Sequence, residues 1–453
     1  MQPSETHAHA PFRRIGLLSL AVVGWFGGLV GTSGAVHAVA YLIEAAEKWI
    51  AAPNGAQLYT RVVQPSPALY PGQRFPALIA IPGGTGAGAP LADNPLYRNL
   101  AASGFVVTVF NAEGRGSGRP GDLVSQGAEN CNGYAHQDDL KAVIEHAAAL
   151  TNVDVTNIGV ETASLGIAIG AGALGRYPDL PVAYLVDQEG PHDNRVITFY
   201  DAGRERAVCG HMSTVTDPSA ANQAFWAERE AVRHIGGFRG RYLRMQAEAD
   251  HAQNPGYFRH AIEMVNAAAP PLFGGAGSAA WTRMNGGDLG NPVNTAYSLS
   301  NPAQYPKWVA GRLSDHPGLN TVYVGEMAAL AAASTVFLRI NGNPYAAVTA
   351  ANPVTVGYTI RGGQGRELFL TLDAPAMNIP LSYRSAAGQW IPLPANLADV
   401  TPFAVAPADG DHTLYTGTVP AGAYSLCLGY DPVANGHLDT GAAVSDCVSA
   451  TVR

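Results

Sequence analysis

The residues best suited to chemistry in this chain surround Ser164, in the segment Thr162-Ala163-Ser164-Leu165-Gly166. A short apolar run leads into the segment and a helix rich in Gly and Ala leaves it, so the serine lies at a strand-to-helix turn. The segment fits the nucleophile-elbow pattern G-x-S-x-G, with Thr162 in the first Gly position. A helix N-terminus there would direct amides toward the hydroxyl and toward an oxyanion beside it. This arrangement predicts acyl transfer with Ser164 as the nucleophile.

Any parallel strand followed by a Gly/Ala-rich helix could give the same local pattern, so the neighbouring elements have to be considered. Nearly continuous apolar runs at 75–82, 105–110, 181–186 and 241–247 are typical of strands buried on both faces. Segments with helical periodicity separate them, most clearly at 138–150. This alternation predicts a parallel sheet with helices on both faces.

The elbow, the order of these elements and the loop Arg115-Gly116-Ser117-Gly118 resemble the α/β-hydrolase superfamily. The resemblance covers about residues 45–334 and implies a doubly wound, mostly parallel sheet. Residues 194–238 are mixed and partly helical, so they are expected to form a small cap or a long crossover.

The periodicity and composition of the sequence change after residue 334. Residues 335–453 show period-two alternation, recurrent Gly, Pro and Asn turn signals, and no long helical stretch. The pattern predicts an all-β sandwich of immunoglobulin-like type. It is similar to the C-terminal accessory modules of exported bacterial proteins.

The resemblance implies a catalytic triad in the chain order nucleophile, acid, base. The base should follow the last strand of the sheet. His251 and His260 come too early for this position, whereas His412 and His437 fall in the sandwich, so elimination leaves His316.

The acid is expected after the strand that follows the crossover, which indicates Asp250, with Asp187 one strand earlier as the alternative. Asp250 could instead cap a turn together with His251.

Two backbone amides are expected to form the oxyanion hole. One belongs to Leu165, directly after the nucleophile, and the other to Gly84 or Thr85 in the Gly-rich loop 83–88. The same loop lacks the Gly-Lys-Ser/Thr ending of a phosphate-binding loop, so a nucleotide site is disfavoured. No cofactor is expected.

The N-terminus resembles an export signal over residues 1–38, because Arg13 and Arg14 precede a long apolar stretch that ends in small residues. A Sec or a Tat route is compatible with it, and an uncleaved membrane anchor is the alternative. Four cysteines agree with an oxidising compartment. The simplest of the three connectivities pairs them within each predicted domain, as Cys131–Cys209 and Cys427–Cys447. We therefore expect a secreted, periplasmic or cell-surface protein.

The net charge and one oxygen-rich loop bear on whether the protein binds nucleic acid or a metal ion. A net charge of −8 and the lack of a basic run exclude nucleic acid as an expected partner. Oxygens at four-residue spacing, on Asp431, Asn435 and Asp439, could bind Ca²⁺, but they fit an EF-hand loop only in part. A solvated turn stapled by the cysteines on either side is the favoured interpretation, so no metal is expected.

The sequence as a whole predicts an exported serine hydrolase that cleaves carboxylic esters, small or polymeric. A peptidase of the same fold is one alternative, because nothing in the sequence fixes the leaving group. A non-catalytic binding or surface protein is the other. The sandwich is expected to contact a cell surface or an insoluble substrate.

Overall fold

The computed structural model describes most of two structured regions of the chain. The described residues are 40–118, 122–196, 203–247, 249–252, 259–269, 276–279, 281–284, 336–341, 345–360, 366–405, 407–408, 410–431, 434–438 and 444–453. The predicted signal (1–38), the base candidate His316, the expected last strand (308–313) and the expected closing helix (320–334) lie outside these residues.

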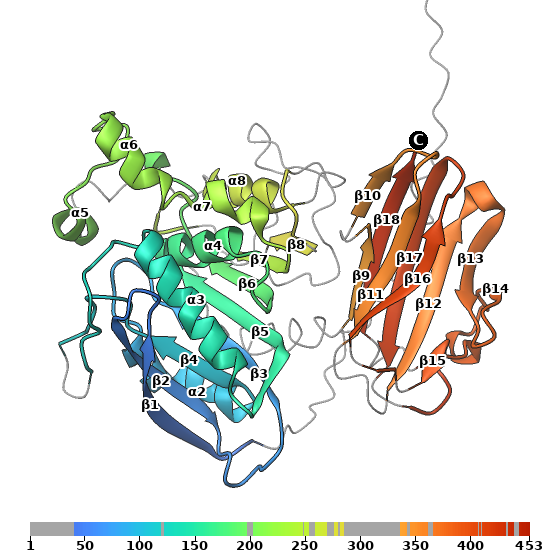
Figure 1. The fold of residues 1–453 in the computed structure, drawn as a ribbon, viewed down its shortest axis with the longest axis horizontal. Helices are drawn as coiled ribbons and strands as arrows, with labels where there is room; N and C mark the ends of the chain where they lie inside the picture. The colour runs from blue at the N-terminus through green and yellow to red at the C-terminus, as the bar shows by residue number, and fades with distance from the viewer. Residues whose placement is uncertain are drawn as a thin grey trace, which may run out of the picture.

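The first region is built on an eight-stranded sheet in the order β1-β2-β4-β3-β5-β6-β7-β8. An antiparallel hairpin, which turns at Gly55 with a φ of +91°, joins β1 to β2, and β2 pairs antiparallel with β4. The remaining neighbours are parallel. The predicted α/β architecture is therefore confirmed (Figure 1). The strands are β1 (Ile43–Ala51), β2 (Gln57–Pro65), β3 (Phe75–Ile81), β4 (Val106–Phe110), β5 (Val153–Ala163), β6 (Val182–Gln188), β7 (Arg241–Met245) and β8 (Trp281–Met284).

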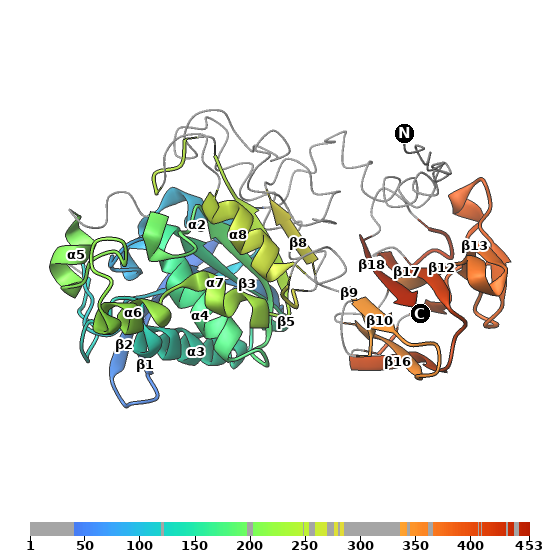
Figure 2. The same ribbon diagram turned by 90° about the horizontal axis from the view of Figure 1, so that it is seen from above.

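Helices cover both faces of this sheet because its central strands are apolar on both sides. One apolar cluster joins the sheet to α3 (Tyr134–Ala148), α4 (Ile167–Arg176) and α8 (Arg259–Ala268). A second cluster joins the opposite face to α2 (Pro95–Ala102). Figure 2 shows α2 and α3 on opposite sides of the sheet. Short 3-10 helices lie at η1 (Ala89–Asp93) and η2 (Ser164–Gly166).

Short helices occupy the stretch between β6 and β7. They are η3 (Asn194–Val196), α5 (Arg204–Cys209), α6 (Ala220–Ala227), α7 (Ala231–His234) and η5 (Ile235–Gly237). The predicted bond between Cys131 and Cys209 is present, with an S–S distance of 1.98 Å, and it ties α5 to the loop before α3.

The second region is all-β, as expected. A seven-stranded sheet has the order β10-β18-β17-β12-β13-β14 with β15 beside β12, and a three-stranded sheet has the order β16-β11-β9. Apolar side chains from both sheets form one core. The elements are β9 (Val336–Ile340), β10 (Tyr345–Val348), β11 (Val354–Ile360), β12 (Glu367–Ala374), η9 (Pro375–Met377), β13 (Ile379–Arg384), β14 (Trp390–Pro392), η10 (Leu397–Asp399), β15 (Ala404–Val405), β16 (Gly410–Gly417), β17 (Gly422–Asp431) and β18 (Val444–Val452).

Two details of the second region bear on the sequence predictions. Cys427 is disulfide-bonded, and Cys447 lies directly opposite it in the antiparallel pair β17–β18. An immunoglobulin-like topology and the predicted domain bounds stay predictions. Among the described residues of the whole chain, no helix has the length and apolar character needed to cross a membrane.

Candidate active site

Ser164 lies in a sharp turn between the end of β5 and the helix α4. Its φ is +49°, a backbone conformation that non-glycine residues seldom adopt, and the strand ends one residue before it. Strain of this kind is typical of a nucleophile elbow, where it raises the hydroxyl above the carboxyl end of the sheet. The structure therefore gives Ser164 the elbow geometry expected from the sequence, although Thr162 replaces the first Gly of the pattern.

His251 is the imidazole that contacts the serine. Its Nε2 lies 2.7 Å from Ser164 Oγ, which is hydrogen-bonding distance. It lies six residues beyond β7, and its side chain is 44% exposed, so a substrate can reach it. Nε2 as acceptor and Nδ1 as donor is the tautomer that suits a general base.

Two carboxylates face the other nitrogen of this ring. Glu189 Oε2 lies 3.1 Å from His251 Nδ1, whereas Asp250 Oδ1 lies 3.5 Å away. Glu189 follows β6 directly, with a φ of +51°. Its amide donates to the Met245 carbonyl and its Oε1 accepts from the Ala247 amide. These bonds fix Glu189 to the end of β7 beside the imidazole.

The two carboxylates also set the charge state of the ring. The hydrogen bond with Glu189 raises the pKa of His251 above its ordinary value. Burial opposes that shift, and the charges of Asp250 and Glu189 add to it. A neighbour that stabilises imidazolium makes the ring a better proton acceptor.

The two aspartates expected as acids have other partners. Asp187 is fully buried, and its Oδ2 accepts from Arg244 at 2.8 Å and from Tyr242 at 2.6 Å. Its Oδ1 accepts from the Gly190 amide, so Asp187 holds the start of the loop that follows β6 at the carboxyl end of the sheet. Asp250 accepts from the Gln246 side chain and from the Ala252 amide.

Neither His251 nor Glu189 is among the site residues predicted from the sequence. A base that follows the last strand, as the resemblance implies, excludes His251, and Glu189 is not one of the two predicted acids. One signal was available: polar residues directly follow two adjacent parallel strands, at 187–193 and 248–251, and such ends meet at one edge of a sheet.

The Gly-rich loop approaches the elbow closely. A Cβ placed on Gly83 would lie 3.0 Å from Ser164 Cβ, so only glycine fits without a shift. The amides of Gly84, Thr85 and Leu165 thus belong to two segments that meet at the nucleophile, which supports their expected role in an oxyanion hole. Thr85 is buried, and Gly84 has a φ of +60°.

A cavity of about 730 Å³ lies beside this loop, and Thr85, Gly86 and Ala87 form part of its wall. Backbone and polar groups dominate its wall, with Thr85, Arg115, Ser117 and Glu129 among them, and Val208 of α5 forms one side. Its volume is sufficient for part of a substrate.

Some acidic and histidine side chains lie close enough together to bind a metal ion. Among the described residues, the groups close enough to share an ion are Glu189, Asp250 and His251 at the site, and a second set formed by His192, Asp193 and Glu263. Of the calcium candidates of the sandwich, Asp431 and Asn435 lie among the described residues. Asn435 Oδ1 accepts from the His437 amide, as in a turn, and Asp439 lies outside the described part of the chain.

Comparison with known proteins gives neighbours by structure alone. No family model matches the sequence, and no curated protein matches it. An acetyl xylan esterase from Thermoanaerobacterium sp. JW/SL YS485 is 15% identical, with a TM-score of 0.43 over 68% of this chain and 92% of that one. An acetyl xylan esterase from Paenibacillus sp. R4 is 15% identical, with a TM-score of 0.38 over 56% and 79%.

Peptidases occur among the neighbours as well. A putative dipeptidyl aminopeptidase IV from Bacteroides ovatus is 15% identical, with a TM-score of 0.41, covering 64% of this chain and 35% of that one. The neighbours named here are thus two esterases and a putative peptidase by their names. Identities this low say nothing about activity, which has to be inferred from the site.

Proposed function

We propose that the protein is a serine hydrolase that cleaves carboxylic esters with Ser164 as nucleophile, His251 as general base and Glu189 as the acid that orients the base. The observation that carries this proposal is the 2.7 Å contact between His251 Nε2 and Ser164 Oγ on a strained elbow. The carboxylate of Glu189 on the other ring nitrogen completes the triad. This assignment replaces His316 and Asp250 as base and acid.

The geometry supports a two-step acyl transfer. His251 Nε2 takes the proton of Ser164 Oγ while that oxygen forms a bond to the ester carbonyl carbon. The carbonyl oxygen becomes an oxyanion, which we expect the amides of Leu165 and Thr85 to bind. His251 then returns the proton to the leaving alkoxide, the C–O bond breaks, and an acyl-enzyme remains. Water attacks that ester by the same sequence and regenerates the serine.

Hydrolysis of p-nitrophenyl acetate and butyrate, together with labelling by a fluorophosphonate, tests the triad. Ser164→Ala should abolish labelling, and both Ser164→Ala and His251→Ala should lower turnover by about 10⁴-fold or more. His316→Ala is the matched control and should retain turnover. A large loss in His316→Ala with little change in His251→Ala would overturn the assignment of the base. A wild type that neither labels nor turns over would favour a non-catalytic binding protein.

The leaving group can be tested with the same chromophore. A p-nitroanilide with the same acyl group should be cleaved far more slowly than the p-nitrophenyl ester if the enzyme is an esterase. Comparable rates on the two would favour the peptidase alternative.

We also propose that the protein is exported. Both Cys131 and Cys427 are disulfide-bonded, and disulfides persist mainly in oxidising compartments. N-terminal sequencing of protein recovered outside the cytoplasm should show cleavage near residue 38. Recovery of the full-length chain from the cytoplasm would contradict export.

A further inference from the structure

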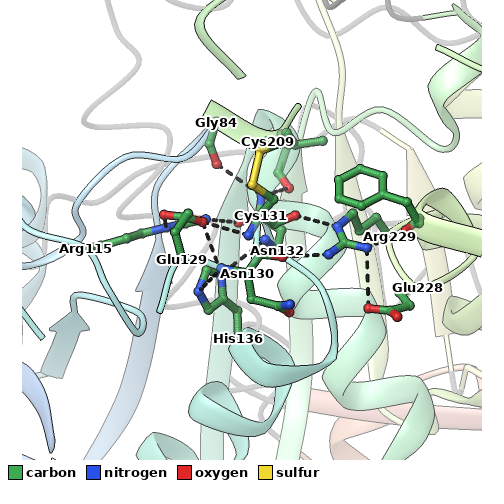
Figure 3. Close-up of a disulfide and its surroundings, with 12 residues drawn as sticks. Gly84, Arg115, Glu129, Asn130, Cys131, Asn132, His136, Cys209, Glu228 and Arg229 are labelled. Atoms are coloured by element: carbon green, nitrogen blue, oxygen red, sulfur yellow. Dashed lines mark hydrogen bonds and ion pairs between the residues drawn. A yellow bond between two sulfur atoms is a disulfide. The ribbon is translucent and has the colours of Figure 1, made fainter. Parts of the chain in front are cut away.

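Asn132 joins the two segments that are expected to form the oxyanion hole. Its side chain is fully buried, and its Nδ2 donates to the Gly84 carbonyl at 3.1 Å (Figure 3). The same Nδ2 donates to the Leu165 carbonyl at 3.0 Å. One amide group therefore connects the Gly-rich loop to the nucleophile elbow. The chemistry of the partners fixes the orientation of this amide, because carbonyl oxygens only accept hydrogen bonds and the guanidinium of Arg115 only donates them.

The bond to Gly84 has a direct consequence for Thr85. In a trans peptide the C=O and the following N–H point in opposite directions. Anchoring the Gly84 carbonyl on Asn132 therefore turns the Thr85 N–H away from Asn132. This peptide belongs to the loop that approaches Ser164, so a donor at Thr85, rather than one at Gly84, is the one whose direction Asn132 controls.

Arg115 and His136 hold Asn132 in place. Arg115 donates to Asn132 Oδ1 at 2.7 Å and forms a two-pronged ion pair with Glu129. The Asn132 amide donates to His136 Nδ1 at 3.1 Å. Burial lowers the pKa of His136 to about 3, so the ring stays a neutral acceptor over the physiological range.

The residue before Asn132 is restrained as well, by the disulfide and by Arg229. Cys131 precedes Asn132 and is bonded to Cys209, and its carbonyl accepts from Arg229 at 2.8 Å. Cys131 and Asn132 have φ values of 52° and 65°, which a chain maintains only when its surroundings enforce them. On the same helix as Cys209, Glu205 packs against Gly84, since a Cβ there would lie 2.5 Å from Glu205 Oε1.

We propose that Asn132 is a positioning residue that aligns the Gly84–Thr85 peptide with the nucleophile elbow, and that the Cys131–Cys209 disulfide and Arg115 hold Asn132 for this purpose. The proposal rests on the serine hydrolase function proposed above. It assigns a buried asparagine and a remote disulfide a role in binding the oxyanion, although neither touches the substrate.

The test compares Asn132→Asp with a matched variant. Aspartate has nearly the same shape and keeps an acceptor for Arg115, but it places an oxygen against two carbonyl oxygens. Asn222 is the control, because it is also buried and its Nδ2 also donates to two carbonyls, those of Met212 and Asp217, both at 2.8 Å. Asn222→Ala removes an equivalent pair of bonds in another part of the fold.

Three readouts separate positioning from general stability. With p-nitrophenyl acetate, Asn132→Asp should lower kcat by about 10- to 100-fold with little change in KM, because the misplaced donor acts in the transition state. The inhibition constant of a trifluoromethyl ketone, whose adduct with Ser164 carries an oxyanion, should rise by a similar factor. The acid limb of the pH profile should not move, since Glu189 and His251 are unchanged. Asn222→Ala should keep kcat and the inhibition constant of wild type.

Each outcome decides the proposal. Wild-type kcat and inhibitor affinity in Asn132→Asp, alongside an inactive Ser164→Ala, would overturn this inference and leave the proposed function intact. An active Ser164→Ala, or a wild type without turnover, would overturn both. If Asn132→Asp does not fold, Asn132→Ser takes its place and is assayed below its melting temperature. The same changes in kcat and in the inhibition constant are then expected, and wild-type values would overturn the inference.

Discussion

Thr162 and Gly170 face each other across the turn that carries the nucleophile. A Cβ placed on Gly170 would lie 2.5 Å from Thr162 Cγ2, so the helix α4 can pack on β5 only because residue 170 has no side chain. A nucleophile elbow usually has a glycine two positions before the serine. Here that position holds Thr162, and the space for its side chain comes from Gly170 on the helix. The Thr162 hydroxyl, which is fully buried, donates to the Val186 carbonyl at 3.3 Å and so does not lack a partner.

Gly170→Ala should therefore destabilise the protein and lower its activity. Overpacking of a close contact lowers the free energy of unfolding by about 1–3 kcal/mol. The higher helix propensity of alanine offsets up to about 1 kcal/mol of this loss. Thermal or urea unfolding measures the net loss. The double variant Thr162→Ala, Gly170→Ala should recover most of it, because the clashing methyl group is gone. Additive losses in the double variant would show that the two residues do not interact.

The pH dependence of kcat/KM should report His251. The base acts only when it is neutral, so activity should rise with pH through a pKa that lies above the ordinary histidine value. Glu189→Gln removes the group that stabilises imidazolium most, so the acid limb should move to lower pH. The rate should also fall on the order of 10²- to 10⁴-fold, because the ring loses the partner that fixes its tautomer.

Asp250→Asn is the matched control for this experiment. Its carboxylate lies farther from the ring, at 3.5 Å, so the shift should have the same sign and be smaller. A larger loss of rate and a larger shift in Asp250→Asn than in Glu189→Gln would make Asp250 the acid, as the sequence analysis expected.

The sequence allowed the sheet and the elbow at Ser164 to be predicted because both depend on local patterns. Apolar runs indicated the buried strands, and the elbow around Ser164 has a distinctive composition. The partners of Ser164 depend on which strand ends meet in space, and elimination by chain order excluded His251. Likewise, the packing of Thr162 against Gly170 joins residues eight positions apart that only the fold brings face to face. The hydrogen bonds of Asn132 join the loop before α3 to the Gly-rich loop and to the elbow, and no sequence pattern indicates that these three segments meet.

The cavity beside the Gly-rich loop predicts a residue that affects substrate size. Val208 on α5 is 47% exposed and lines the cavity, so Val208→Trp should fill part of it without disturbing the core. KM for a bulky ester should rise by about 3- to 10-fold, a loss of about 1 kcal/mol of binding, while KM for p-nitrophenyl acetate should change less. Val215→Trp, at a position that is 71% exposed and does not line this cavity, is the control. Equal KM values for the bulky ester in the two variants would exclude the cavity as a binding site for it.

The free energy of unfolding should depend on pH because of His192, which is fully buried in the segment that follows β6. Its Nε2 lies 2.7 Å from Glu263 and 3.2 Å from Asp193, and its Nδ1 lies 2.7 Å from His260 Nδ1, which already accepts from the His192 amide. Because His260 Nδ1 is an acceptor, His192 Nδ1 is the donor of the pair, and the two carboxylates beside Nε2 favour a second proton on the ring. Arg195 pairs with Asp193 and Arg259 with Glu263, so the carboxylates stay ionised beside it.

The sign of the effect follows from the direction of the shift. Burial alone would lower the pKa of His192, but the hydrogen bonds and charges of Asp193 and Glu263 outweigh it, and the pKa is raised above its ordinary value. The stabilisation is then fully present below the unfolded value, near 6.5, and is lost as pH rises through the folded value. Melting temperatures measured from pH 5.5 to 9 should fall over that window.

His192→Gln should remove this dependence. The variant should be less stable than wild type by about 3 kcal/mol at pH 6, because it removes a buried cation from between Asp193 and Glu263 and leaves each carboxylate only its arginine partner. The difference in stability should narrow as pH rises. His412→Gln, in the second region of the chain, is the control and should keep the wild-type slope. A pH slope of stability in His192→Gln that matches wild type would show that His192 does not carry the charge.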